Sequence, residues 1–193
     1  MTDDPLDSHD AAGVSLLLRT LYEGQPERAR AIAAQRRRPL DVFEAAALGD
    51  ATRLHLVLAE APERARALNS DGFSALGLAA FFAQPACARA LVDAGAPIDE
   101  PSRNAMRVTP LHSAVASRQH EIVAWLLERG ADPNARQHGG FTPLHAAAQH
   151  GDVALLRLLL GHGADRSART DDGASAADLA RARGHLEVLA WLA

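Results

Sequence analysis

The sequence predicts an all-α repeat solenoid of about six helix–turn–helix units, and three observations support this fold class. First, the segment TPLHSA at Thr109–Ala114 recurs as TPLHAA at Thr142–Ala147, 33 residues later. Second, glycines recur at fixed offsets, since Gly140 precedes Gly151 by 11 residues and Gly163 by 23. Third, 48% of the residues are hydrophobic but only 4% are aromatic, so alanine, leucine and valine must fill the interior. Repeats of this length predict stacked units that bury their apolar faces against their neighbours.

Each repeat carries the start and stop signals of two short helices. Thr142 followed by Pro143 predicts a helix start, because the hydroxyl can accept a hydrogen bond from a free N–H and proline has no N–H to lose there. Gly151 predicts the turn that ends the first helix, and Gly163 predicts the left-handed residue that ends the second. Between these glycines, apolar residues at helical spacing over 153–160 predict a second helix with one buried face.

The TPLHxA motif at a period of 33 residues, followed by GAD at 130–132 and 163–165, resembles the ankyrin repeat. The resemblance covers nearly all of the chain after residue 10. It implies that a short β-hairpin, or finger, precedes each helix pair, and that the imidazoles of His112 and His145 hydrogen-bond to the backbone of the neighbouring finger. The connection from Pro39 to Asp41 is too short for a full finger.

The resemblance also sets the domain organisation that we expect. Residues 1–10, with four aspartates, are predicted to be an acidic disordered tail. Residues 11–193 are predicted to form a single ankyrin repeat domain, in which the third unit contains a two-residue insertion. The expected units are 11–38, 39–70, 71–105, 106–138, 139–171 and 172–193.

The resemblance implies a non-catalytic protein–protein interaction module, an adaptor, scaffold or inhibitor, that binds another protein through its concave groove and hairpin tips. Partner-binding residues are then expected where the repeat letters vary, just before the glycine that ends each first helix and just after the turn of each finger. The candidates are Phe73, Phe81, Phe82, Val108, Ser117, Phe141, Gln149, His150 and Arg183.

The third unit differs from its neighbours because Phe81 and Phe82 are bulky where the other units carry residues such as alanine, serine, glutamine and histidine. Exposed rings would give an apolar centre with a polar rim, the anatomy of an interface hot spot. Buried rings would instead pack between adjacent helices. The sequence leaves both interpretations open.

The sequence lacks the common catalytic and cofactor motifs, so we expect no enzyme, no cofactor and no metal. It contains no GxxxxGK[ST] loop for phosphate, no HExxH motif for zinc and no GxSxG nucleophile elbow. One alternative is an enzyme or metal-binding protein that uses the His138, His150 and His162 region. Another is structural self-association through the Phe-lined groove, so a homodimer is the alternative to the expected monomer.

Composition limits the partners and the compartment. The net charge of -4 gives no basic field for phosphates, so we expect no nucleic acid partner, and no apolar run reaches the ~20 residues that cross a bilayer. The single cysteine, Cys87, indicates a reducing compartment, the cytoplasm, and we expect its thiol to be buried. All 20 basic residues are arginine, which suggests a bacterial GC-rich genome. The charge runs Arg36–Arg38 and Glu63–Arg66 are predicted to be solvated faces.

Overall fold

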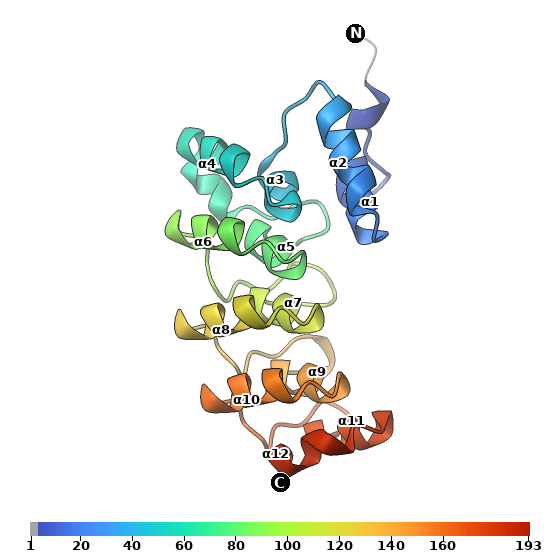
Figure 1. The fold of residues 1–193 in the computed structure, drawn as a ribbon, viewed down its shortest axis with the longest axis vertical. Coiled ribbons are helices and arrows are strands. Elements are labelled where there is room, and N and C mark those ends of the chain that lie inside the picture. Colours follow the sequence, from blue (N-terminus) through green and yellow to red (C-terminus); the bar gives the residue numbers. More distant parts are fainter. Residues whose placement is uncertain (1–3) are drawn as a thin grey trace. The chain divides into compact units, whose positions relative to one another are not determined.

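The structure is a computed structural model that describes residues 4–193, and it consists of short helices arranged in pairs (Figure 1). The chain divides into two compact units, one that ends at Pro97 and one that spans Ile98–Ala193. Within the described residues, β structure is limited to three isolated antiparallel bridges, His9↔Ser15, Leu68↔Ser74 and Arg169↔Ser175. The predicted all-α repeat fold class is therefore confirmed.

The first unit contains three helix pairs. Its elements are η1 (Pro5–Asp7), α1 (Leu16–Tyr22), α2 (Pro26–Gln35), α3 (Val42–Leu48), α4 (Ala51–Glu60), η2 (Pro62–Arg66), α5 (Ala75–Phe81) and α6 (Pro85–Asp93). The first helices of the pairs stack in chain order, α1 on α3 and α3 on α5, and the second helices α4 and α6 also pack together. The α1–α2 pair is tilted relative to α3–α6 (Figure 1), and α2 packs on α1 and α3.

The second unit also contains three helix pairs. Its elements are α7 (Pro110–Ala116), α8 (His120–Glu128), η3 (His138–Gly140), α9 (Pro143–Gln149), α10 (Val153–Gly161), α11 (Ala176–Arg183), η4 (Leu186–Val188) and α12 (Leu189–Leu192). Here α9 packs between α7 and α11, and α10 packs between α8 and α12. Because no helix pair can bury its apolar face alone, this regular stacking supplies the core of the unit.

A finger precedes five of the six first helices, and each finger is closed by one backbone hydrogen bond. These bonds join the N–H of Asp10, Asn69, Ser102, Gln137 and Thr170 to the carbonyl oxygens of Val14, Phe73, Val108, Phe141 and Ala174, respectively, at 2.8–3.0 Å. The finger from Ser102 to Val108 is two residues longer than the other four, which accounts for the predicted insertion. The connection before α3, residues 36–41, has no such bond among the described residues, in line with its predicted shortness.

The expected acidic tail extends into the described chain, although its first three residues lie outside the described residues. From Asp4 onward it has defined structure, because Asp4 caps the single turn of η1 by accepting a hydrogen bond from the Leu6 N–H at 3.0 Å. The Asp7 carboxylate then lies 3.6 Å from Arg38 Nε and 3.9 Å from Arg36 Nε. Residues 4–10 therefore form part of the first unit.

The charge run Arg36–Arg38 is not a solvated face along its whole length. The Arg37 side chain is exposed, but Arg36 is buried and donates a hydrogen bond to Glu44 Oε1 at 2.8 Å. The prediction is wrong for Arg36, because its partner is a fully buried carboxylate on α3. Cys87 is fully buried, as predicted, and burial followed by the charge of Asp50 raises the pKa of its thiol to about 11.

Candidate functional site

Three aromatic side chains gather at the carboxyl ends of α1 and α5 in the first unit. Tyr22 is the last residue of α1, Phe81 is the last residue of α5, and Phe82 follows it. The Tyr22 and Phe82 rings stack with centroids 5.9 Å apart, and Phe81 meets Phe82 edge-on at 5.2 Å. Such pairs stabilise a cluster beyond the area that they bury. We call Tyr22, Phe81 and Phe82 the aromatic cluster.

The members of the aromatic cluster differ in exposure. Phe82 is half-buried, whereas Tyr22 and Phe81 expose 41% and 42% of their surface. The Tyr22 hydroxyl is held by the side chains of Asn69 and Asp71, and burial followed by the charge of Asp71 raises the pKa of Tyr22 to about 12. Of the two interpretations left open by the sequence, packing therefore describes Phe82 and exposure describes Phe81.

Tyr22 is the residue that the candidate set lacked. It stands two residues before Gly24, and Phe81 occupies the corresponding end of α5. The position before the first-helix turn was therefore the signal that could have identified it. Phe73 lies in the finger before α5, half-buried, where its N–H donates to Asn69 Oδ1 at 2.8 Å.

In the second unit the structure places Val108 and Phe141 in fingers. Both are half-buried, and the Val108 N–H donates to Ser102 Oγ at 2.9 Å. The Phe141 ring meets the His145 ring edge-on at 5.8 Å, and its carbonyl accepts a hydrogen bond from His112 Nε2 at 3.3 Å. Part of each side chain is thus used to hold the finger on the helices.

The remaining candidates lie at successive carboxyl ends of the first helices of the second unit. Ser117 and His150 are the residues that cap α7 and α9, Gln149 ends α9, and Arg183 ends α11. The Ser117 hydroxyl donates to the Ser113 carbonyl at 3.0 Å, so it also serves the helix end. Arg183 is exposed, while the other three are half-buried. The repeat therefore brings these positions into register, as predicted from the 33-residue spacing.

The histidines of the TPLH segments serve the fold. His112 Nδ1 accepts a hydrogen bond from the Thr109 N–H at 3.3 Å, so its proton lies on Nε2, which donates to the Phe141 carbonyl of the next finger. Burial lowers the pKa of His112 to about 4, although the bonds to the carbonyls of Phe141 and Ala135 oppose the shift. His145 Nδ1 accepts from the N–H of Thr142 at 3.2 Å in the same way.

The three histidines that the repeat left unexplained occupy different parts of a repeat. His138 begins the turn η3 in a finger, His150 caps α9, and His162 caps α10 with its Nδ1 2.9 Å from the Leu158 carbonyl. Among residues 4–193, no three His, Cys, Asp or Glu side chains are grouped so that they could hold a metal ion.

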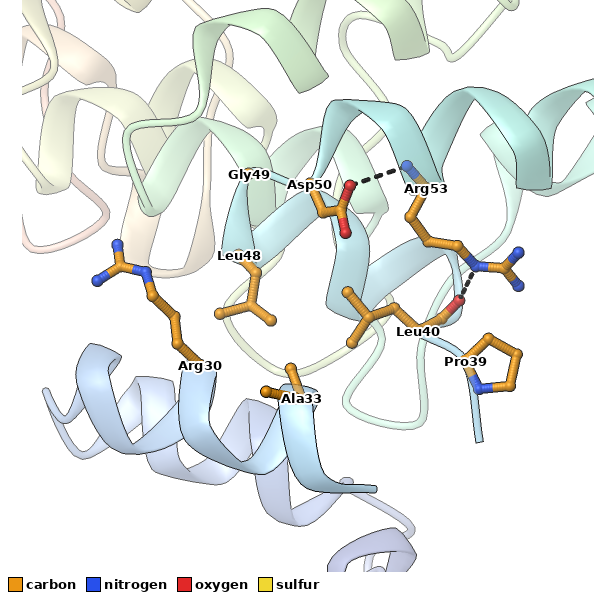
Figure 2. Close-up of a pocket in the computed structure, with 9 residues that line it drawn as sticks. Arg30, Ala33, Pro39, Leu40, Leu48, Gly49, Asp50 and Arg53 are labelled. Carbon is orange, nitrogen blue, oxygen red and sulfur yellow. Dashed lines mark hydrogen bonds between the residues drawn. The ribbon is translucent and has the colours of Figure 1, made fainter. Parts of the chain in front are cut away.

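An open groove of about 510 Å³ separates α2 from the start of α4 in the first unit (Figure 2). Alanine, leucine and proline side chains line most of it, together with Arg30, Asp50 and Arg53. The Asp50 carboxylate caps α4 by accepting the Arg53 N–H at 2.8 Å, and Arg53 Nε donates to the Leu40 carbonyl at 2.8 Å. Since its carboxylate and one arginine are engaged in helix-end contacts, the groove offers no paired acid and base for catalysis.

A smaller cavity of about 190 Å³ in the same unit contains the residue types of a nucleophilic site, namely His9, Ser15 and Asp41. Two of them are already used as helix caps. Ser15 Oγ accepts from the Leu18 N–H at 3.3 Å, and Asp41 accepts from the N–H groups of Phe43 and Glu44 at 2.9 Å. These contacts hold the side chains in structural roles rather than in a nucleophile–base arrangement.

Helix pairs in register, joined by turns and flanked by fingers, define a helical repeat protein. Comparison with known proteins specifies the family. The sequence model described as "Ankyrin repeats (many copies)" matches residues 78–127, 111–160 and 148–193, which together cover more than half of the chain. The chain therefore belongs to the ankyrin repeat family. Ankyrin repeats are generally protein–protein interaction modules, and the family is typically non-catalytic.

Curated relatives share part of this chain. It is 38% identical over 102 residues to the human (Homo sapiens) B-cell lymphoma 3 protein and 36% identical over 102 residues to the B-cell lymphoma 3 protein homolog of Mus musculus. These alignments cover 52% of this chain but only 22% of each relative, so the chain spans about a fifth of their length. Within the described part of the chain, no helix is long and apolar enough to cross a membrane.

Proposed function

We propose that this protein is a non-catalytic adaptor, scaffold or inhibitor that binds another protein through its fingers and the exposed ends of its first helices. The observation that carries the proposal is the exposure of Phe81 on a fixed support. An aromatic ring that is held rigidly and left open to solvent can bury apolar area on binding at little entropic cost. The stacking of Phe82 on Tyr22, and the hydrogen bonds of Tyr22, supply that support.

The proposed partner-binding residues follow the two compact units. In the first unit they are Phe81 and Phe82 with Tyr22 added, together with Phe73 of the finger. In the second unit they are Val108, Ser117, Phe141, Gln149, His150 and Arg183. Fingers present side chains beyond the helices, and helix ends carry the residues that vary between repeats, so both are suited to recognition by shape.

We further propose a cytoplasmic, bacterial protein that acts as a monomer. Support for the compartment is the single cysteine, Cys87, which is buried and has no disulfide partner. Support for the source is the use of arginine for all 20 basic residues.

Photo-crosslinking tests the proposed interaction surface. The photoreactive residue p-benzoylphenylalanine is placed at position 81, and in a matched control at position 56 of α4, where Leu56 is also exposed and apolar. In the cells that contain this protein, position 81 should give a crosslinked product with a second protein, and position 56 should give none. A product of twice the mass of the chain would show self-association instead, and equal products at both positions would contradict the proposed surface.

A further inference from the structure

Basic side chains line the turns that follow α7, α9 and α11 in the second unit. The turn after α7 carries Arg118 and His120, the turn after α9 carries His150, and the turn after α11 carries Arg183 and His185. We call these five residues the basic strip. They stand at equivalent places in three consecutive repeats, so the stacking of the helices brings the turns side by side.

One buried carboxylate joins the first two turns and is fully engaged. The Asp152 side chain is 5% exposed and accepts from Arg118 Nε at 3.1 Å and His120 Nε2 at 3.0 Å. It also caps α10 by accepting the Leu155 N–H at 3.1 Å. These contacts hold the pKa of Asp152 below its usual range even though burial acts to raise it. Asp152 therefore has little capacity left to neutralise His150.

The surroundings of His150 are mostly cationic. Burial and then the charge of Arg118 lower the pKa of its imidazole, and Arg183 and His185 act in the same direction against Asp152. His150 Nδ1 is buried and has no hydrogen-bond partner within the described residues. His185 Nδ1 lies 3.5 Å from Glu187, the other carboxylate at this end of the unit.

Arg183 is the cation of the basic strip that remains available. Its side chain is exposed and makes no ion pair within residues 4–193, whereas Arg118 is engaged by Asp152. An unpaired guanidinium next to an imidazole offers several hydrogen-bond donors to a carboxylate from outside the chain.

We propose that the basic strip binds a segment of the partner protein that is rich in aspartate and glutamate, with one carboxylate seated between His150 and Arg183. The inference rests on the proposed function and deepens it by naming the chemistry of the partner segment. The binding is electrostatic, so it depends on salt and on the charge of the strip.

The same geometry predicts the direction of the pH dependence. As the pH falls from about 7.5 to about 5.5, the histidines His120, His150 and His185 take up protons, while glutamate, with an ordinary pKa of about 4.3, stays ionised. Arg118, Arg183 and the two carboxylates, Asp152 and Glu187, keep their charges over this range. Binding of an acidic segment should therefore tighten as the pH falls.

The test uses the full chain and a fluorescein-labelled peptide of eight glutamates, with binding followed by fluorescence anisotropy at pH 7.5 and pH 5.5. The variant Arg183→Gln should weaken binding about fivefold, the effect of losing roughly one kcal/mol from a charge pair. The variant His150→Gln should reduce the gain in affinity at the lower pH. The matched control is Arg166→Gln, which removes an exposed arginine in the finger before α11 and should change binding less than twofold.

NMR supplies a second readout that surface charge alone would not move. A bound carboxylate beside His150 should raise the pKa of that imidazole toward its ordinary value, while His162, at the end of α10, should not respond. Melting temperatures that match the parent protein confirm that Arg183→Gln and His150→Gln are folded.

Three results would overturn the inference. Equal weakening by Arg183→Gln and Arg166→Gln would show attraction to the whole chain only. No binding at either pH would reject the site, and tighter binding of an eight-residue oligothymidylate would assign the strip to nucleic acid. If the peptide fails while the crosslink at position 81 persists, only the acidic segment is rejected. Loss of the crosslink itself rejects the proposed function.

Discussion

Arg36 and Glu44 form a buried ion pair in the first unit. Arg36 donates to both carboxylate oxygens of Glu44, and neither side chain exposes more than 1% of its surface. Burial alone would raise the pKa of Glu44, but the hydrogen bonds from Arg36 and from the Asp41 N–H hold it below its usual range. The pair ties the end of α2 to α3 across the connection that lacks a finger.

Breaking this pair on one side should be more harmful than removing it. Arg36→Met or Glu44→Gln leaves a buried polar group without its partner, so each should lower the free energy of unfolding by about 3–5 kcal/mol. The double variant Arg36→Met/Glu44→Leu should recover part of that loss, because two apolar side chains replace two desolvated charges. Urea denaturation measures all three. A double variant as unstable as the sum of the single ones would show that the charges are independent.

His112 should make the stability of the second unit depend on pH. Its pKa falls from 6.5 to about 4 on folding, so the unfolded chain binds the additional proton between these values. The free energy of unfolding should therefore be full above pH 6.5 and fall by ~3 kcal/mol as the pH drops to about 4. His112→Gln keeps an acceptor at this capping position and should flatten the dependence.

The control for this pH dependence is His162→Gln, since His162 is exposed at the end of α10. It should keep the slope of the parent protein. Carboxylates also titrate toward pH 4, so the result is the difference between the parent and His112→Gln. An unchanged slope in His112→Gln would mean that the buried imidazole takes up its proton as freely in the folded state as in the unfolded one.

The regular part of the fold could be predicted because each signal acts within one repeat. Thr109 caps α7 by accepting a hydrogen bond from the His112 N–H, as the Thr-Pro start predicts. Gly163 adopts a left-handed φ of 88° after α10, as the glycine predicts. Both features depend on residues a few positions apart, so periodicity and helix capping suffice to find them.

The irregular part could not be predicted, since it depends on contacts that periodicity does not describe. Three consecutive arginines at 36–38 have the pattern of a solvated run, and burial of Arg36 follows only from a partner in the next repeat. The pattern Asp41-x-x-Glu44 was a capping-box signal for that partner. The stacking of Tyr22 on Phe82 joins the first repeat to the third, because the second repeat has no finger between them.

Phe81 and Phe82 should separate stability from binding. Phe82 is half-buried and contacts both other rings of the aromatic cluster, so Phe82→Ala should lower the free energy of unfolding by about 1–2 kcal/mol. Phe81→Ala removes an exposed ring and should change it by less than about 0.5 kcal/mol. Urea denaturation of the two variants, made side by side, compares these values. A large loss for Phe81→Ala would identify its ring as core and remove the anchor on which partner binding is proposed to depend.

Gly140 should be the glycine of the second unit that tolerates a side chain least. It adopts a φ of 73°, and an added Cβ would lie 2.9 Å from the backbone nitrogen of Asp171 in the next finger. Gly163 has a φ of 88° but no atom within 4 Å of the same position, so it isolates the cost of the backbone conformation. Gly163→Ala should cost about 1–2 kcal/mol, and Gly140→Ala should cost about 1–3 kcal/mol more, because the neighbouring finger must shift. Urea denaturation compares them, and equal losses would mean that the fingers are free to move apart.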